Sequence, residues 1–158
     1  MKDTEIADLI KREDERQKSV INLIASENYV SDDVLEALGS RFNNKYAEGY
    51  PGARYYGGNE IVDEVERLAQ VRALKAFDLN ENDWAVNVQA LSGSPANLAV
   101  YLALAPKDGK IMGMRLDHGG HLTHGHKVSA SGKFFTTIQY GVDKETELLN
   151  FEEIEKTA

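Results

Sequence analysis

The sequence predicts an α/β protein with a largely parallel sheet that is covered by helices on both faces. Segments typical of strands alternate with segments typical of helices in the second half of the chain, and this alternation is characteristic of parallel sheets. Hydrophobic residues make up 42% of the 158 residues and charged residues 28%, which indicates a globular chain. The length matches one ordinary domain, since domains of about 100–150 residues are the most common.

The charge and the cysteine content exclude several classes of partner and site. The net charge of −8 makes a nucleic acid or an anionic membrane an unfavourable partner, and no apolar run reaches the ~20 residues that cross a bilayer. The absence of cysteine excludes disulfides and thiolate metal sites. The first twenty residues resemble neither a secretory signal nor a transit peptide, so we expect a cytoplasmic protein.

The first forty residues predict two helices joined by an extended segment. Residues 4–18 carry mixed charges and a thin apolar stripe, which indicates an exposed helix. Residues 21–30 form an apolar segment that turns polar at Ser26, where the residues alone favour a loop over a polar site. Ser31 is a suitable N-cap for a short helix through Arg41, because two aspartates follow it and the helix dipole favours acids there.

The remaining segments predict two long helices, three strands and a last helix. Asn59 is a plausible N-cap for a helix over residues 60–77, and the apolar run at 95–105 indicates a buried helix. The segments typical of strands are residues 84–90, 110–114 and 133–142. A helix opens at residue 151 and the chain stops within its pattern, so we expect an N-terminal piece of a larger protein.

Residues 45–58, "KYAEGYPGARYYGG", crowd tyrosines and glycines into one stretch that we expect to be a loop. Glu48 lies among these tyrosines, and a carboxylate surrounded by aromatic rings is partly desolvated, which suits proton transfer near neutral pH. A surface turn with packed tyrosines explains the pattern equally well. Arg54 is expected to form an ion pair or to lie on the surface.

A second stretch, "VNVQALSGSPANLAVY", leads from a strand through Ser92, Gly93 and Ser94 into a helix with Pro95 at its first position. This arrangement directs backbone N–H groups and two hydroxyls to one place, with the positive end of the helix behind them, as in a phosphate site. The alternative is that Ser94 only caps the helix and Gly93 only makes a tight turn. The pattern is neither a Walker motif nor a dinucleotide fingerprint.

All four histidines of the chain lie in "DHGGHLTHGH", residues 117–126. A metal site is one interpretation, but zinc ligands are usually fixed on regular structure, and the glycines here predict a loose backbone. An imidazole that lies flat on a planar ligand, with Gly119 and Gly120 allowing close approach, is a second interpretation. A solvated loop is the third.

Taken together, the motifs "LIASEN", "KYAEGYPGARYYGG", "VNVQALSGSPAN" and "DHGGHLTHG" resemble serine hydroxymethyltransferase, in that family's order and spacing. The resemblance extends from Ile21 to the end. It implies a fold-type-I transferase that depends on pyridoxal 5'-phosphate (PLP). Residues 1–40 would form an N-terminal helical arm, and 41–158 an incomplete PLP-binding large domain. Ala90 stands where the family usually has proline, and the Schiff-base lysine would lie beyond Ala158.

The resemblance also implies a homodimer or tetramer whose active sites are shared between subunits. Ser92, Gly93 and Ser94 would hold the PLP phosphate, with Tyr46 reaching it from the partner chain. His121 would stack on the pyridine ring, and no metal is expected.

The family's reaction interconverts serine plus tetrahydrofolate with glycine plus 5,10-methylenetetrahydrofolate. By resemblance, Glu48 would be the general acid/base or would assist the folate chemistry, and Tyr56 would act with it on the amino-acid substrate. The remaining contacts implied for substrate and folate are Ser26 and Tyr55, and Leu116, Gly120 and Leu122. Residues 1–158 alone are expected to be inactive.

Two rival functions remain at the level of the sequence. A truncated, non-catalytic relative would act as a binding or dimerisation module. A stand-alone metal protein would use the histidines of residues 117–126 as ligands.

Overall fold

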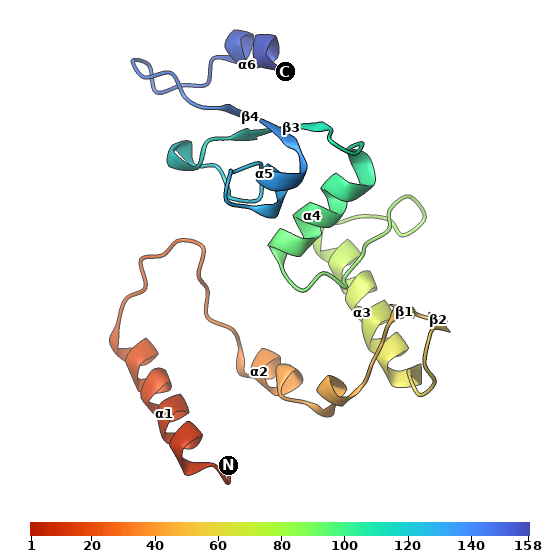
Figure 1. Ribbon diagram of the computed structural model, residues 1–158. Helices are drawn as coiled ribbons and strands as arrows, with labels where there is room; N and C mark the ends of the chain where they lie inside the picture. The colour runs from red at the N-terminus through yellow and green to blue at the C-terminus, as the bar shows by residue number, and fades with distance from the viewer. The chain divides into compact units, whose positions relative to one another are not determined.

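The computed structural model describes residues 1–158 as a mixed α/β chain with two compact units (Figure 1). The first unit is Met1–Val65 and the second is Glu66–Ala158. The predicted helix at 60–77 is present as α3 (Glu60–Ala76), which begins in the first unit and ends in the second.

Two helices and a 3-10 turn precede the tyrosine-rich stretch. The predicted helix at 4–18 is confirmed as α1 (Thr4–Ser19). Ser31 caps α2 (Asp32–Leu38) as predicted, but α2 ends three residues before Arg41. It ends early because Gly39 is a poor helix former and Ser40 caps a separate turn, η1 (Arg41–Asn44), by accepting from the Phe42 N–H.

The tyrosine-rich stretch contains a small hairpin, which the loop prediction missed. Strands β1 (Gly49–Tyr50) and β2 (Ala53–Arg54) pair antiparallel, with Gly49 opposite Arg54. Pro51 and Gly52 form the turn, and Gly52 has a φ of 81°, which glycine adopts without strain. A Cβ on Gly49 would lie 2.4 Å from the Ala53 carbonyl oxygen, so the two strands need glycine there.

The second unit contains the predicted parallel strands. β3 (Lys110–Met114) and β4 (Thr136–Tyr140) pair in parallel from Lys110 with Thr136 to Met114 with Tyr140. The elements around them are α4 (Gly93–Leu104), η2 (Leu116–His118), α5 (Ala130–Phe134) and α6 (Phe151–Thr157). The short helix α5 takes the first residues of the predicted strand at 133–142 and contacts both β4 and α4.

Three predictions about this part of the chain need correction. Residues 84–90 form no strand, because their alternating pattern finds no partner strand among the residues of the chain. Helix α4 is present, but none of its residues is buried. Asn59 occupies the predicted N-cap position of α3, and its carbonyl accepts the Asp63 N–H at 2.8 Å, but its side chain does not cap the helix: Nδ2 donates to the Tyr56 carbonyl, and Oδ1 has no hydrogen-bond partner.

Few apolar side chains of this chain are covered. Phe135 is its one buried hydrophobic residue, and the accessible surface is 13412 Å². A folded monomer of 17.6 kDa exposes about 7,900 Å². Much apolar surface is therefore available for contact with other protein surfaces. No helix combines the length and apolar character needed to cross a membrane.

Candidate functional site

The N-terminus of α4 carries the residues predicted to hold a phosphate. Ser92 is the N-cap in extended conformation, and its side chain makes no capping hydrogen bond. Ser92, Gly93 and Ser94 are all exposed. Pro95 is the third residue of the helix and not the first as predicted, but it still lies in the first turn, whose N–H groups have no intrahelical acceptor. These groups and the two hydroxyls can therefore receive an anion.

Four other helices have an N-cap whose side chain satisfies part of the first turn. In each, the N-cap side chain accepts a hydrogen bond from a backbone N–H; these residues are Asp3, Ser31, Ser129 and Asn150. The unused Ser92 hydroxyl is therefore compatible with an external acceptor at α4.

The histidine-containing loop, residues 117–126, packs directly on β3 and is not loose as predicted. A Cβ on Gly113 of β3 would lie 2.3 Å from the His124 carbonyl oxygen, and a Cβ on Gly120 would lie 1.9 Å from the Met114 carbonyl oxygen. Because glycine has no side chain, two backbone segments can pack closely at each of these positions. Their role is close packing, which fixes the loop.

Helix α5 holds the far end of this loop. The Ser131 side chain is only 3% exposed; its hydroxyl donates to the Thr123 carbonyl at 2.6 Å and accepts the Gly125 N–H at 3.1 Å. Ser129 donates to the His126 carbonyl at 2.8 Å. The two serines therefore tie the backbone of the loop at Thr123, Gly125 and His126 to α5.

His121 is exposed, and its ring is held by hydrogen bonds. Its Nδ1 accepts the Thr123 N–H at 3.2 Å and lies 2.7 Å from the Thr123 hydroxyl. The same hydroxyl accepts from Asn97 Nδ2 at 2.8 Å. One face and the Nε2 edge of the imidazole can therefore meet a ligand.

His124 is the inward-facing neighbour of His121. Its Nδ1 is hydrogen-bonded to the Tyr101 hydroxyl, and its ring centroid lies 5.9 Å from that of His121 at 63°. Phe135 packs against the edge of the Tyr101 ring at 6.1 Å. Burial raises the pKa of the Tyr101 phenol, so it remains a neutral donor.

A cavity of about 410 Å³ lies between the first turn of α4, this loop and α5. It brings together two of the predicted residues, Ser94 and Leu122. The other lining residues are Pro95, Leu98, Thr123, Ser129, Ala130 and Ser131. Leu116, in η2, and Gly120 are not among them. The lining combines apolar side chains with four hydroxyl-bearing residues, which suits a flat organic ligand that carries an anionic group.

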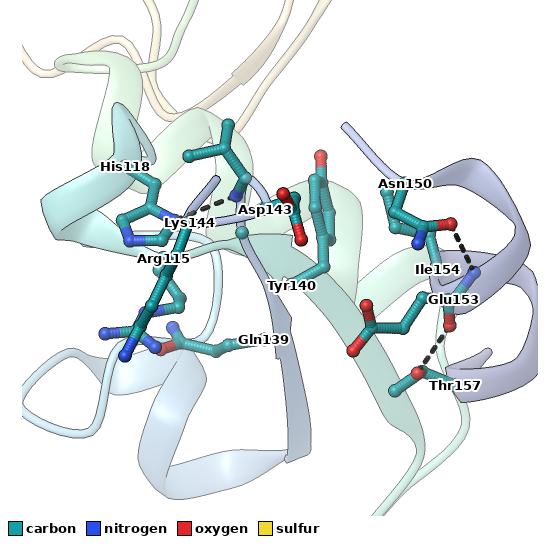
Figure 2. A pocket seen from close by; sticks show the side chains of 12 residues that line it. Arg115, His118, Gln139, Tyr140, Asp143, Lys144, Asn150, Glu153, Ile154 and Thr157 are labelled. Carbon is teal, nitrogen blue, oxygen red and sulfur yellow. Dashed lines mark hydrogen bonds between the residues drawn. The ribbon is translucent and has the colours of Figure 1, made fainter. Parts of the chain in front are cut away.

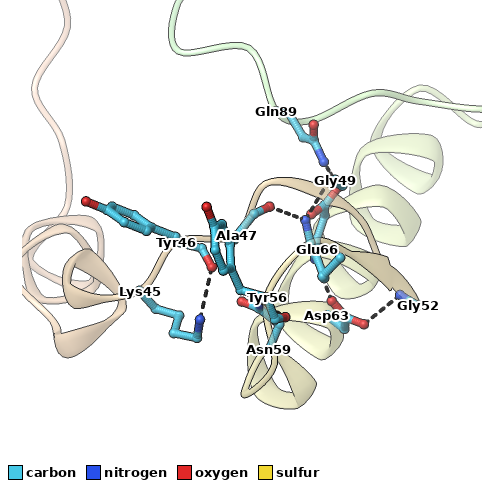
Figure 3. Close-up of polar contacts among 11 residues, drawn as sticks. Lys45, Tyr46, Ala47, Gly49, Gly52, Tyr56, Asn59, Asp63, Glu66 and Gln89 are labelled. Atoms are coloured by element: carbon cyan, nitrogen blue, oxygen red, sulfur yellow. Dashed lines mark hydrogen bonds and ion pairs between the residues drawn. The ribbon is translucent and has the colours of Figure 1, made fainter.

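The predicted residues of the first unit lie on the hairpin and the segment before it. The rings of Tyr46 and Tyr56 are tilted by 51° to each other with centroids 6.0 Å apart, and Lys45 Nζ lies 5.8 Å from the Tyr56 centroid (Figure 3). Glu48 is exposed, so the aromatic surroundings expected for its carboxylate do not form within this chain, where Tyr46 and Tyr56 pair with each other.

Tyr55 and Ser26, the other two predicted residues of this unit, are exposed as well. The Tyr55 side chain is 77% exposed, and its backbone N–H donates to the Glu48 carbonyl at 3.2 Å. Ser26 lies in a turn that is closed by a hydrogen bond from the Glu27 N–H to the Ile24 carbonyl.

Arg54 anchors the hairpin to the first turn of α3, which confirms the predicted ion pair. Its Nε contacts Asp63 Oδ1 at 2.8 Å, and Nη1 donates to the carbonyls of Ala47 and Gly49 at 2.6 and 2.8 Å. Asp63 Oδ2 accepts the Gly52 N–H at 2.7 Å. The two side chains are 5% and 13% exposed, so this pair is screened from water.

A smaller cavity of about 220 Å³ lies at the carboxyl ends of β3 and β4 and is bordered by α6 (Figure 2). His118 Nδ1 accepts the Val142 N–H at 2.9 Å, and Arg115 forms two hydrogen bonds to Asp117. Those hydrogen bonds hold the pKa of Asp117 below its usual value. The lining mixes cations with Asp143 and Glu153, so its charges do not converge on one kind of ligand.

The four histidines do not form a metal centre in this structure. No group of three or more His, Asp or Glu side chains lies close enough to hold a metal ion. His118, His121 and His124 each use Nδ1 in a hydrogen bond within the chain.

Comparison with known proteins decides the family. A family model for serine hydroxymethyltransferase matches residues 1–158. The chain belongs to the serine hydroxymethyltransferase family. Its fold class is therefore that of the fold-type-I PLP-dependent transferases, as expected from the motifs.

Individual relatives agree with this family and also show how much of it the chain represents. The serine hydroxymethyltransferase of Caenorhabditis elegans is 53% identical over 99% of this chain and 32% of its own length. The cytosolic enzyme of Oryctolagus cuniculus is 53% identical over 99% of this chain and 33% of its own length. A putative mitochondrial serine hydroxymethyltransferase of Neurospora crassa is 53% identical over 96% of this chain and 29% of its own length. The chain thus spans about a third of the length of the curated relatives that it matches.

Several residues that support the family's motifs were not predicted from the sequence. Asn97, Tyr101, Thr123 and Ser131 hold the histidine-containing loop, and none was singled out. One signal was available: Asn97 is an amide in an otherwise apolar helix, and a polar side chain in such a place usually has a partner.

Proposed function

We propose that the chain is the N-terminal part of a PLP-dependent serine hydroxymethyltransferase that interconverts serine plus tetrahydrofolate with glycine plus 5,10-methylenetetrahydrofolate. The observation that carries this proposal is the family match over residues 1–158. The activity belongs to the longer protein, since the relatives are about three times as long as this chain. We place the protein in the cytoplasm, as the names of several relatives state for those proteins.

The residues of the second unit fit the cofactor. Ser92, Gly93 and Ser94 present hydroxyls and first-turn N–H groups that have no capping partner, as the phosphate of PLP requires. His121 can lie on the pyridine ring, because its ring is fixed at Nδ1 and exposed elsewhere. The cofactor, when bound, serves as an electron sink for the bond broken at the amino-acid substrate.

The exposed residues of the first unit fit a site that a second copy completes. Tyr46, Glu48, Tyr55 and Tyr56 are exposed on one short hairpin region, as side chains that reach a partner's site would be. We propose that Tyr46 contacts the PLP phosphate of the partner subunit, within a homodimer or tetramer. Residues 1–40 would then be an arm and residues 41–158 part of the large domain.

A site completed by a second copy would also bind the two substrates. Ser26, Tyr55 and Tyr56 would orient serine or glycine, and Leu116, Gly120 and Leu122 would contact the pteridine of tetrahydrofolate. Glu48 would become desolvated only in the assembled site, where its carboxyl would give or take a proton near neutral pH.

Replacement of Glu48 by glutamine in the full-length holoenzyme tests this function. Glu48→Gln keeps the shape of the side chain and removes its proton chemistry, so PLP binding should persist while folate-dependent turnover falls about 10²-fold or more. Glu64→Gln, an exposed position on α3, is the matched control and should retain turnover. Unchanged turnover in Glu48→Gln would contradict the acid/base role.

A non-catalytic binding or dimerisation module is the alternative, and the exposed apolar surface of the chain is the observation that favours it. The intact mass of the native protein separates the two functions. A mass several-fold above 17.6 kDa, together with serine hydroxymethyltransferase activity, supports the enzyme. A mass of 17.6 kDa would exclude the transferase and leave the module.

A further inference from the structure

Two side chains on one face of α4 hold two consecutive residues of the histidine-containing loop. Asn97 and Tyr101 are four residues apart and therefore lie one above the other on the helix surface. Asn97 Nδ2 donates to the Thr123 hydroxyl at 2.8 Å, and the Tyr101 hydroxyl is hydrogen-bonded to His124 Nδ1. The helix that begins at the phosphate-binding candidates thus also fixes the loop that carries His121.

We propose that Asn97 and Thr123 are positioning residues that hold His121 as its Nε2–H tautomer, with the imidazole at a fixed place relative to the N-terminus of α4. The proposal rests on the proposed function, because the group to be positioned against His121 is the ring of a phosphorylated planar cofactor. The family resemblance assigns no role to Asn97 or Thr123 and no tautomer to His121.

The hydrogen-bond pattern determines the tautomer. The Thr123 N–H is a donor only, so the nitrogen that it contacts at 3.2 Å, His121 Nδ1, must be an acceptor. Because Nδ1 is an acceptor, the Thr123 hydroxyl must donate in its 2.7 Å contact with Nδ1, and it accepts in turn from Asn97 Nδ2 at 2.8 Å. A neutral imidazole whose Nδ1 accepts carries its proton on Nε2.

The same pattern fixes the orientation of the ring. Two donors from one residue share the single lone pair of Nδ1, so rotation of the His121 side chain would lose both contacts. Asn97 is five residues after Ser92, which corresponds to about 7.5 Å along the helix axis. A rigid helix therefore sets the distance between the anion-binding end and the group that holds His121.

Three variants of the full-length protein test the proposal. Thr123→Val removes the hydroxyl without changing the shape of the side chain, Asn97→Ala removes the donor to that hydroxyl, and Thr123→Ser restores the hydroxyl. Thr136→Val is the matched control, because Thr136 is exposed at the start of β4. Circular dichroism verifies that each variant folds. If Thr123→Val does not fold, Asn97→Ala provides the test in its place.

The first readout is the His121 tautomer, which long-range ¹H–¹⁵N spectra of the ¹⁵N-histidine-labelled apoprotein report; a His121→Gln variant assigns the signal. The wild type and Thr123→Ser should show the Nε2–H form. In Thr123→Val and Asn97→Ala only the Thr123 N–H still holds Nδ1, so the share of the Nδ1–H form should rise. The second readout is PLP binding, followed by absorbance. The dissociation constant should rise about fivefold in Thr123→Val, the effect of one hydrogen bond, and return to within about twofold of wild type in Thr123→Ser.

The possible outcomes separate this proposal from the proposed function. A wild type that shows the Nε2–H tautomer but binds no PLP would contradict the proposed function and leave the positioning of His121 intact. An unchanged tautomer and unchanged PLP affinity in both Thr123→Val and Asn97→Ala would overturn the positioning role. A wild type with its proton on Nδ1 would overturn it as well.

Discussion

Replacement of Arg54 by methionine tests whether the ion pair with Asp63 holds the tyrosine-rich hairpin in place. Methionine retains a long apolar side chain but removes the guanidinium and, with it, the contacts to Asp63, Ala47 and Gly49. The Asp63 carboxylate, only 13% exposed, would then lose its bond to Arg54 Nε. We expect the variant to be strongly destabilised in the hairpin region.

The magnitude follows from the burial of the pair. Breaking a buried ion pair by removing one partner costs about 3–5 kcal/mol, because a charge remains without its counter-ion. Each hydrogen bond from the guanidinium to a backbone carbonyl contributes about 1.5–3 kcal/mol. These contributions are part of the cost of breaking the ion pair and are not added to it. Arg54→Met should therefore lower the free energy of unfolding by about 3–5 kcal/mol.

Urea unfolding of the full-length protein measures this change, without added cofactor so that ligand binding does not alter the result. Arg12→Met on α1 is the matched control: Arg12 and Asp8 are 69% and 66% exposed and 3.9 Å apart. Such a surface pair contributes about 0–1 kcal/mol. The double variant Arg54→Met/Asp63→Leu should recover much of the lost stability, since no buried charge is left.

Two results would refute this reasoning. A loss below about 1 kcal/mol in Arg54→Met would put the pair in the range of exposed ion pairs. The second result is additivity: the double variant loses as much free energy of unfolding as Arg54→Met and Asp63→Leu lose together. The two side chains would then not act as a pair.

Three further predictions concern the packing of the second unit and the charges of the chain. Gly113→Ala should cost about 1–3 kcal/mol in urea unfolding and lower PLP affinity, because the new Cβ would displace the His124 backbone; an unchanged unfolding midpoint would contradict this. The raised pKa of Tyr101 predicts that stability falls as pH rises above about 10, where the unfolded phenol ionises first, and Tyr101→Phe should remove this part of the pH dependence. The hydrogen bond from Arg16 lowers the pKa of Glu13 to about 2. The stabilisation of α1 by this pair should therefore be complete above the normal carboxyl pKa and be lost as pH falls toward 2. An NMR titration of Glu13 with an ordinary midpoint would contradict this prediction.

Much of the local structure followed from the sequence, because caps and strand patterns act over a few residues. Ser31 caps α2, and the parallel strands β3 and β4 lie where apolar residues indicated strands. The Pro51–Gly52 hairpin could also have been predicted, since Pro-Gly is the signature of a type II turn.

The features that the sequence did not reveal depend on segments far apart in the chain. Residues 84–90 have the alternation of a strand, but a strand needs a hydrogen-bonding neighbour, which alternation does not specify. The glycines at 113 and 120 gave no sign of whether they loosen the backbone or allow close packing, because this depends on which segment crosses them. The role of Asn97 likewise depends on Thr123, 26 residues further along the chain.

The predicted site residues remain predictions, and the reason is again physical. Glu48, Tyr46, Tyr55 and Tyr56 are exposed, so this chain alone does not enclose them in a site. Their proposed roles arise only when a second copy covers them. A sequence motif identifies such residues, whereas the contacts of one chain do not.

The exposed apolar surface also matters while the protein is being made. A ribosome adds roughly 5–20 residues per second, so residues 1–158 are synthesised in about 8–30 seconds. During this time Ile21 and Leu23, each 88% exposed, and Leu91, 92% exposed, have no cover from within the segment. Exposed side chains of this kind are what chaperones bind and what drives aggregation. We therefore expect chaperones to bind this segment while it is being synthesised.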